Sequence, residues 1–269
     1  MRVWLLFLLL GSLPPDLDLD GLPDAVEQEL LDRFVPRFYA SAEDCDLMPA
    51  EFEPGVAVPR VKARNGTIYG QAFPVGEEIE LHFYHLWARD CGQKPHDLDA
   101  EHVSVLLHKQ GGEWRARYWL AAAHQETICD VSMAARAGLV YAEWRGPEVW
   151  ISKGKHASFF SREACQSGCG GDRCERTRML APGRVINLGE PDAPLQGAIW
   201  TGFLKAKMGT DFGPELRQLL EESDRAVVVK PSTPAVKPVI AAGSSTVSAV
   251  GTSVKTTKSA VKRWFERRF

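Results

Sequence analysis

The chain has 269 residues, of which 45% are hydrophobic and 25% are charged, a balance typical of globular proteins and unlike disordered, collagen-like or coiled-coil chains. The formal net charge of −3 argues against a dedicated nucleic-acid-binding protein. No apolar run reaches the roughly 18–20 residues that a membrane-spanning helix needs, which excludes a protein with several membrane spans.

The first 13 residues are typical of a short secretory signal peptide. Arg2 precedes an apolar run over residues 3–10, and the small residues Gly11 and Ser12 follow. A buried N-terminal strand is the alternative, because no A-x-A cleavage triplet is present. The pattern predicts a protein that is secreted or held in the cell envelope.

Residues 14–29 contain a calcium-loop pattern and the start of a helix. The run over residues 16–27 matches D-x-[DN]-x-[DN]-G-x5-E, with Gly21 at the sharp turn. The candidate Ca²⁺ ligands are Asp16, Asp18, Asp20, Leu22, Asp24 and Glu27. We expect one structural Ca²⁺ site and no sensor EF-hand, since only the signal and two prolines precede the loop. A solvated acidic linker is the alternative.

The rest of the chain predicts a helix followed by short strands. The helix begins at Pro23, carries apolar residues at four-residue spacing and ends at Pro36. Alternating or apolar runs between turn residues predict strands at 78–84, 103–108, 114–122, 139–144, 148–152 and 185–188. The sequence Gln-Gly-Gly-Glu at 110–113 predicts a turn, and 214–223 predicts a second helix with proline in its first turn.

These elements predict a β-rich α+β fold. We expect an antiparallel β-sandwich with peripheral helices, stapled by disulfides, over residues 30–224. Residues 225–257 are rich in Pro, Ser, Thr and Val and predict a linker or disordered tail. Residues 258–269 form a basic amphipathic segment suited to an anionic membrane or envelope surface; a solubilising tail is the alternative. The sequence does not predict the oligomeric state.

The six cysteines agree with export. An even number in an exported chain predicts disulfides, and the C-x3-C-x4-C spacing of the last three suits a stapled Gly-rich loop better than a zinc site. The pairing stays open among Cys45, Cys91, Cys129, Cys165, Cys169 and Cys174.

Acidic and histidine side chains crowd between residues 90 and 102. Asp99 and Glu101 are two apart just before an alternating strand, so both carboxylates would face one side. Asp90 ends the preceding strand, and His96 is expected in the loop between. Carboxylate oxygens with one imidazole suit Ca²⁺ or Mg²⁺, so we predict a metal-binding pocket made by these four residues.

These residues also carry a resemblance to a known family. The runs DAEHVSV at 99–105 and GKHAS at 154–158 resemble the paired motifs D-W-E-H-V-T-V and G-x-H-A-S of the Vps62-like family. They are also similar to the heptapeptide G-H-R-H-D-W-E of the necrosis-inducing, Nep1-like (NPP1-like) proteins. Shorter similarities at 30–38, 47–51 and 187–190 extend the resemblance over roughly residues 30–212.

The resemblance implies a cavity at the edge of a sandwich. In it Asp90, His96, Asp99 and Glu101 would bind Mg²⁺ or Ca²⁺, and two further cavity histidines would match His124 and His156. Leu98 and Ala100 stand where the family has its second histidine and its tryptophan. The cation ligands are retained, but the loss of the second histidine argues against a toxin-like activity.

We therefore expect a secreted protein whose cation-loaded acidic pocket recognises a glycan, a phosphate group or a glycolipid head group. The alternatives are a metal-dependent hydrolase of glycosidic or phosphate esters, with His124 or His156 as general base, and a purely structural ion in an envelope protein. The positions of the two histidines relative to the ion distinguish the hydrolase from the other two hypotheses. A histidine one water away from the ion favours catalysis, and one packed behind the ligands favours binding or structure.

Overall fold

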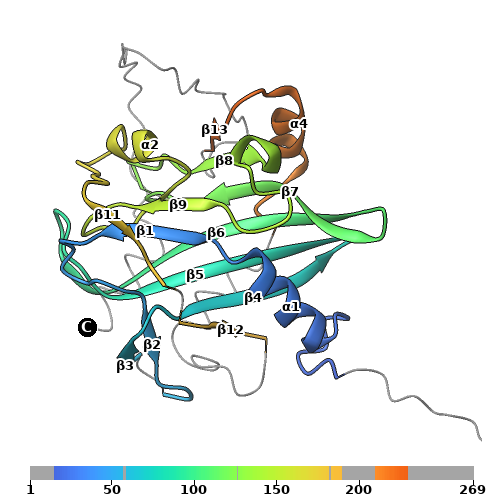
Figure 1. Cartoon of the computed structure of the whole chain (residues 1–269), viewed down its shortest axis with the longest axis horizontal. Helices are drawn as coiled ribbons and strands as arrows, with labels where there is room; N and C mark the ends of the chain where they lie inside the picture. Colours follow the sequence, from blue (N-terminus) through green and yellow to red (C-terminus); the bar gives the residue numbers. More distant parts are fainter. Residues whose placement is uncertain (1–14, 57–58, 126, 182, 190–209, 230–269) are drawn as a thin grey trace, which may run out of the picture.

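The computed structural model describes residues 15–56, 59–125, 127–181, 183–189 and 210–229. They form two packed β-sheets with helices at the periphery (Figure 1), which confirms the predicted β-rich sandwich. The predicted signal peptide, most of the predicted 225–257 tail and the basic segment 258–269 lie outside the described residues. Within the described ranges, no helix has the length and apolar character needed to cross a membrane.

The larger sheet has seven strands. Their order across the sheet is β12 (Val185–Asn187), β4 (Ile68–Val75), β5 (Glu78–Asp90), β6 (His96–Gln110), β7 (Glu113–Ala121), β8 (Met133–Arg136) and β13 (Val227–Val228). Neighbours pair antiparallel except β12 and β4, which are parallel. Gly111 and Gly112 turn the chain between β6 and β7 with positive φ values of 62° and 88°, which confirms the predicted turn.

The second sheet has four strands and packs on one face of the first (Figure 1). Its order is β10 (Ser158–Phe159), β9 (Glu148–Ile151), β1 (Arg37–Ser41) and β11 (Thr177–Met179), with β1 and β9 parallel. A separate hairpin is formed by β2 (Ala50–Phe52) and β3 (Val61–Arg64). The α-helices within the described ranges are α1 (Asp24–Phe34), α2 (Arg162–Gln166) and α4 (Pro214–Glu222).

Strand alternation sends apolar side chains to both faces of the larger sheet. Leu81 and Phe83 of β5 join the core shared with the four-stranded sheet and with α1, whose Leu30 and Phe34 are buried as the helical pattern predicted. On the opposite face, residues of β6 and β7 pack beneath α4. The larger sheet is therefore buried on both faces, so any polar cluster between its layers is also buried.

Outside the predicted metal pocket, two sequence predictions differ from the structure. Residues 139–144 do not form a strand: the 3-10 helix η1 (Ala137–Val140) occupies this region and Tyr141 takes a left-handed φ of 53°. Of the apolar side chains in this run only Ala142 is fully buried, whereas Leu139, Tyr141 and Trp144 are exposed, and Trp119 Nε1 donates to the Ala142 carbonyl at 2.9 Å. The predicted tail also begins too early. Val227 is buried and pairs with β8, so the folded domain continues to residue 229.

Disulfides join all six cysteines of the chain, as the sequence predicted, and the structure supplies the pairing. The bonds are Cys45–Cys91, Cys129–Cys169 and Cys165–Cys174. Two of them link segments 40 and 46 residues apart, so they restrict the unfolded chain over long loops.

Glu51 on β2 provides a test of pH-dependent stability. Lys62 donates to its carboxylate at 2.8 Å, and together with Asn65 and Arg184 this lowers the pKa of Glu51 from 4.5 to about 2. We expect Glu51→Gln to lower the free energy of unfolding at pH 7 by about 1–2 kcal/mol. The full pKa shift corresponds to roughly 3 kcal/mol, but Lys62 and Arg184 are 54% and 58% exposed and solvent screens their charges.

The sign of the pH dependence follows from the lowered pKa. The stabilisation by Glu51 is present above its unfolded pKa of 4.5 and is lost as the pH falls towards 2. Urea denaturation of wild type and Glu51→Gln should therefore give curves that separate at pH 7 and converge near pH 2. Glu53→Gln, which removes an exposed ion pair with Arg60, is the matched control and should change stability by less than about 0.5 kcal/mol. A Glu51→Gln difference that is constant with pH would contradict the assignment.

Candidate metal centre

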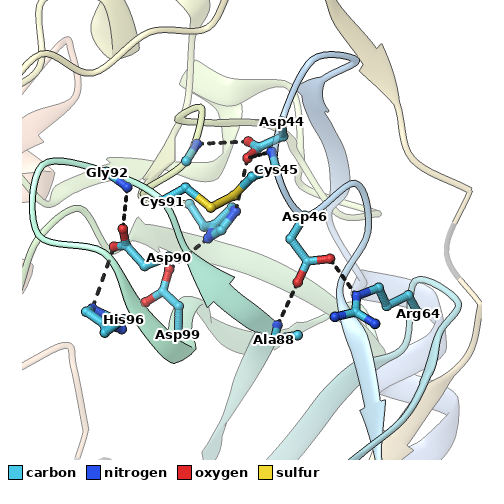
Figure 2. The surroundings of a disulfide bond; sticks show 12 residues. Asp44, Cys45, Asp46, Arg64, Ala88, Asp90, Cys91, Gly92, His96 and Asp99 are labelled. Atoms are coloured by element: carbon cyan, nitrogen blue, oxygen red, sulfur yellow. Dashed lines mark hydrogen bonds and ion pairs between the residues drawn. A yellow bond between two sulfur atoms is a disulfide. The ribbon is translucent and has the colours of Figure 1, made fainter.

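The hairpin formed by β5 and β6 brings three of the four predicted ligands together. Asp90 is the last residue of β5, and His96 is the first residue of β6 and its direct partner across the hairpin. The sequence analysis placed His96 in the loop between the strands, and the structure corrects this: His96 is the first residue of β6. One ligand atom each from Asp90, His96 and Asp99 lie within 4.8 Å of one another. Figure 2 shows these side chains converging beside a disulfide.

A backbone irregularity explains how His96 and Asp99 meet. In a regular strand, residues three apart point to opposite faces. Leu98 lies between them with a left-handed φ of 64°, which interrupts the alternation in β6. Such a conformation is uncommon for a residue other than glycine, and strained residues of this kind are concentrated at functional sites. The sequence alone gives no sign of it.

The centre is partly buried and opens to solvent on one side. The side chains of Asp90 and Asp99 are 15% and 11% exposed, whereas that of His96 is 54% exposed. Asp90 Oδ1 accepts from the Gly92 amide at 2.6 Å, and its Oδ2 lies 3.7 Å from His96 Nε2. Burial and the charge of Asp99 raise the pKa of Asp90. Two carboxylates that repel each other in a partly dry site favour a bound cation.

Glu101 is placed differently from the other three. It lies two residues beyond Asp99 on β6, opposite His85 in the strand pairing. Its carboxylate does not belong to the group of ligand atoms that lie within 4.8 Å of one another. Glu101 therefore stays a predicted ligand, on the strength of the sequence pattern.

His156 lies behind the centre and holds Asp99. Its Nδ1 is 2.8 Å from Asp99 Oδ2, its Nε2 is 3.6 Å from Asp44 Oδ1, and its ring stacks on Trp87 with centroids 3.9 Å apart. The side chain is completely buried. Burial alone would lower the pKa of His156, but Asp44 and Asp99 raise it to about 9. The ring is therefore an imidazolium at neutral pH that fixes Asp99 in place.

A disulfide fixes the position of this arrangement. Figure 2 shows the Cys45–Cys91 bond joining the loop that carries Asp44 to the loop that follows Asp90. Asp44 Oδ2 accepts from the Gly154 amide at 2.9 Å, and so holds the segment that carries His156. Asp44 was missed in the sequence, where its only signal is its position next to a cysteine.

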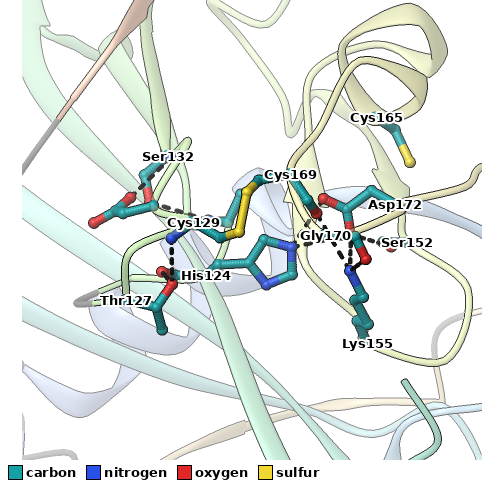
Figure 3. Close-up of polar contacts among 12 residues, drawn as sticks. His124, Thr127, Cys129, Ser132, Ser152, Lys155, Cys165, Cys169, Gly170 and Asp172 are labelled. Atoms are coloured by element: carbon teal, nitrogen blue, oxygen red, sulfur yellow. Dashed lines mark hydrogen bonds and ion pairs between the residues drawn. A yellow bond between two sulfur atoms is a disulfide. The ribbon is translucent and has the colours of Figure 1, made fainter. Parts of the chain in front are cut away.

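His124 belongs to a second polar cluster. Its Nε2 lies 2.8 Å from Asp172 Oδ2, and Asp172 Oδ1 accepts from Ser152 Oγ at 2.7 Å. Lys155 Nζ lies 3.4 Å from the same carboxylate. Figure 3 shows the cluster beside the Cys129–Cys169 bond. Asp172 is completely buried and is hydrogen-bonded to both His124 and Ser152. We therefore interpret this cluster as an internal network that supports the Gly-rich loop.

The predicted calcium loop folds as a compact acidic turn before α1. Asp16, Asp18 and Asp20 each place an oxygen within 4.8 Å of the others, and Gly21 has a φ of 96°. Asp16 Oδ2 accepts from the Gly21 amide at 3.1 Å. Among the described residues, Asp16 Oδ1 and Asp20 Oδ2 are buried and have no hydrogen-bond partner. Buried carboxylate oxygens in this state are costly unless a cation satisfies them.

The remaining predicted loop ligands lie around this turn. Asp24 accepts from the Leu17 amide at 2.8 Å, and the Leu22 amide donates to Asp20 at 2.7 Å. Glu27 is buried on α1 and accepts from Asn187 Nδ2 at 2.8 Å, which connects the loop to the end of β12. Burial and mutual repulsion raise the pKa of Asp18, and burial with repulsion from Asp16 raises that of Asp20.

Comparison with known proteins gives only distant structural similarity. No protein-family model matches the chain, and no curated protein matches it. Similar solved structures include NLPPya in complex with mannosamine, at 17% identity over 70% of this chain and 81% of that one, with a TM-score of 0.39. A toxin fold for microbial attack and plant defense shares 14% identity over 75% and 88% (TM-score 0.41), and the non-toxic HaNLP3 protein shares 13% over 75% and 88% (TM-score 0.40).

These structures come from the Nep1-like group whose motifs the sequence resembles. The similarity concerns the fold. At this level of identity and structural overlap, it says nothing about the ligand of this chain.

Proposed function

We propose that Asp90, His96 and Asp99 hold one Mg²⁺ or Ca²⁺ ion, and that this ion binds the oxygen atoms of a glycan or phosphate-bearing ligand. The observation that carries the proposal is the convergence of their three ligand atoms at a partly exposed hairpin end. Hard divalent cations prefer oxygen ligands and take six or more of them. Three protein ligands, or four with Glu101, leave positions for water or for hydroxyl and phosphate oxygens.

The placement of the two candidate histidines favours binding over hydrolysis. His156 is completely buried and is held between two carboxylates, so its proton is committed to keeping Asp99 in position. His124 is bonded to the buried Asp172 in a separate network. A general base has to reach the attacking water in the open site. The completely buried His156 does not reach the open side of the site, and His124 is engaged by Asp172 in the network that supports the Gly-rich loop.

We also propose that the protein works outside the cytoplasm. The three disulfides support this, because such bonds persist in oxidising compartments. The predicted signal peptide and the predicted contact of residues 258–269 with an anionic surface remain parts of this proposal. The acidic loop at residues 16–27 is proposed to hold a separate, structural Ca²⁺ ion.

A variant at Asp90 tests the proposed centre. Asp90→Asn keeps the size of the side chain but removes the charge, and we expect it to weaken Mg²⁺ binding at least tenfold in isothermal titration. Asp97→Asn is the matched control, because Asp97 lies on the same strand, is exposed and is not one of the converging residues. Equal Mg²⁺ affinity in the two variants would contradict the site.

The ligand is then sought on arrays of glycans and of phosphate-bearing lipid head groups. Wild type and Asp97→Asn should both bind the array ligand, and both should lose this binding when EDTA is added. Asp90→Asn should not bind even without EDTA. Signal on one array and not the other identifies the ligand class. Binding that survives EDTA would contradict recognition through the ion.

A further inference from the structure

The outer face of the larger sheet carries a buried polar cluster that the proposed function does not use. Glu80 and His82 on β5 lie beside His102 and Ser104 on β6, with His82 and Ser104 paired across the strands. All four side chains are buried. The neighbouring positions on this face pack apolar side chains beneath α4. A cluster of this kind is costly to bury unless every polar atom finds a partner.

Asp211 completes the cluster from a distant part of the chain. Its Oδ2 lies 3.1 Å from His102 Nε2 and 3.8 Å from His82 Nδ1, and it accepts from Ser104 Oγ at 2.6 Å. One ligand atom each from His82, His102 and Asp211 lie within 4.8 Å of one another. The Asp211 side chain is 17% exposed and is the most exposed of the three.

Glu80 determines which nitrogen of His82 faces this group. Glu80 Oε1 lies 3.0 Å from His82 Nε2 and also accepts from the Asp211 amide at 2.7 Å. Because a carboxylate only accepts hydrogen bonds, the His82 nitrogen that faces Glu80, Nε2, carries a proton. In the neutral form of the imidazole, which is the form that binds metal ions, Nδ1 then presents its lone pair. Among the described residues, that buried Nδ1 has no hydrogen-bond partner. A carboxylate behind a histidine is the usual support of a metal-binding imidazole.

We infer that His82 Nδ1, His102 Nε2 and the Asp211 carboxylate form a second metal site, selective for a Zn²⁺-like transition-metal ion. Two imidazoles and one carboxylate suit such an ion, in contrast to the oxygen-rich centre at Asp90. Bonds of about 2.0–2.1 Å to a tetrahedral ion place ligand atoms about 3.3 Å apart. The 3.1 Å between His102 Nε2 and Asp211 Oδ2 fits this spacing directly. The 3.8 Å between His82 Nδ1 and Asp211 Oδ2 has to shorten by about half an ångström.

The site has a clear structural consequence. Asp211 lies three residues before α4, and the same segment continues into β13, which pairs with β8. A metal ion held jointly by β5, β6 and Asp211 would fasten this outer layer to the sheet. The two centres lie on strands of the same hairpin, and their β6 ligands Asp99 and His102 are three residues apart, which places these two side chains on opposite faces of the strand.

The test measures Zn²⁺ binding in the Asp90→Asn background, so that the first centre does not contribute. We expect this parent to bind one Zn²⁺ per chain in equilibrium dialysis, and Co²⁺ to give a visible absorption band at the same stoichiometry. His82→Gln and Asp211→Asn should weaken Zn²⁺ binding at least 100-fold. Glu80→Gln, which removes the support of His82, should weaken it about 10–100-fold.

His108→Gln is the matched control, because His108 lies on β6, is half-buried and does not belong to the cluster. It should bind Zn²⁺ as the parent does. Asp211→Asn alters a partly exposed side chain, and metal-free melting curves and circular dichroism show whether each variant is folded. Absence of Zn²⁺ binding in the parent, or equal binding in folded Asp211→Asn and His108→Gln, would overturn the inference. Neither result would bear on Mg²⁺ binding at Asp90.

Discussion

Replacing His156 with glutamine is expected to lower the free energy of unfolding by about 3–5 kcal/mol, the range found when one partner of a buried ion pair is removed. The imidazolium is completely buried between Asp44 and Asp99, and its pKa is raised to about 9. Glutamine still donates a hydrogen bond but carries no charge. Two buried carboxylates are then left without their shared positive partner, and the stack on Trp87 is lost.

Mg²⁺ should recover part of this loss. The proposed ion is bound by Asp99, so it supplies positive charge next to one of the two carboxylates that lose His156. Urea denaturation of His156→Gln in EDTA and in excess Mg²⁺ measures both effects. His108→Gln, a half-buried histidine on β6, is the control and should change stability by less than about 0.5 kcal/mol. A loss below about 1 kcal/mol for His156→Gln in EDTA would show that the ring is not the counter-charge of Asp99.

The parts of the fold that the sequence predicts well are those with a strong local signal. Helix α1 follows from its apolar spacing and its two prolines, and the β6–β7 turn follows from its paired glycines. The strand predicted at 139–144 shows the limit of such patterns. A run of apolar residues does not guarantee burial: around this 3-10 turn Leu139, Tyr141 and Trp144 are exposed, and only Ala142 is fully buried. The true strand β8 is short and alanine-rich, so it lacks the β-branched residues that would indicate it.

The candidate centre is predictable only in part, for the same physical reason. Asp90, His96 and Asp99 are close in sequence and lie on one hairpin, so a local pattern finds them. Asp44 and Asp211 contact His156 and His102 from 112 and 109 residues away in the sequence, and no local pattern records such contacts. The left-handed backbone conformation of Leu98 could not be predicted either, because leucine has no preference for a positive φ.

Calcium is expected to stabilise the protein through the acidic loop before α1. The substitution Asp20→Asn should therefore lower stability relative to wild type only when calcium is present. Without the ion, Asp20 is partly buried and repelled by Asp16, so losing its charge should leave stability unchanged or slightly higher. With Ca²⁺ at about 100 times its dissociation constant, the wild-type loop should gain about 2.7 kcal/mol, and the variant should lose this gain.

The calcium effect is best measured in the Asp90→Asn background, by urea denaturation with Ca²⁺ and with EDTA, so that the other centre is silent. Glu29→Gln is the matched control. Glu29 is exposed on α1, and its substitution removes one negative charge without altering a loop ligand. The Glu29 variant should keep the full gain. The buried oxygens Asp16 Oδ1 and Asp20 Oδ2 make the expectation specific, because calcium would satisfy both of them. Equal stability in Ca²⁺ and in EDTA for the Glu29 variant would leave the loop an acidic turn without a metal.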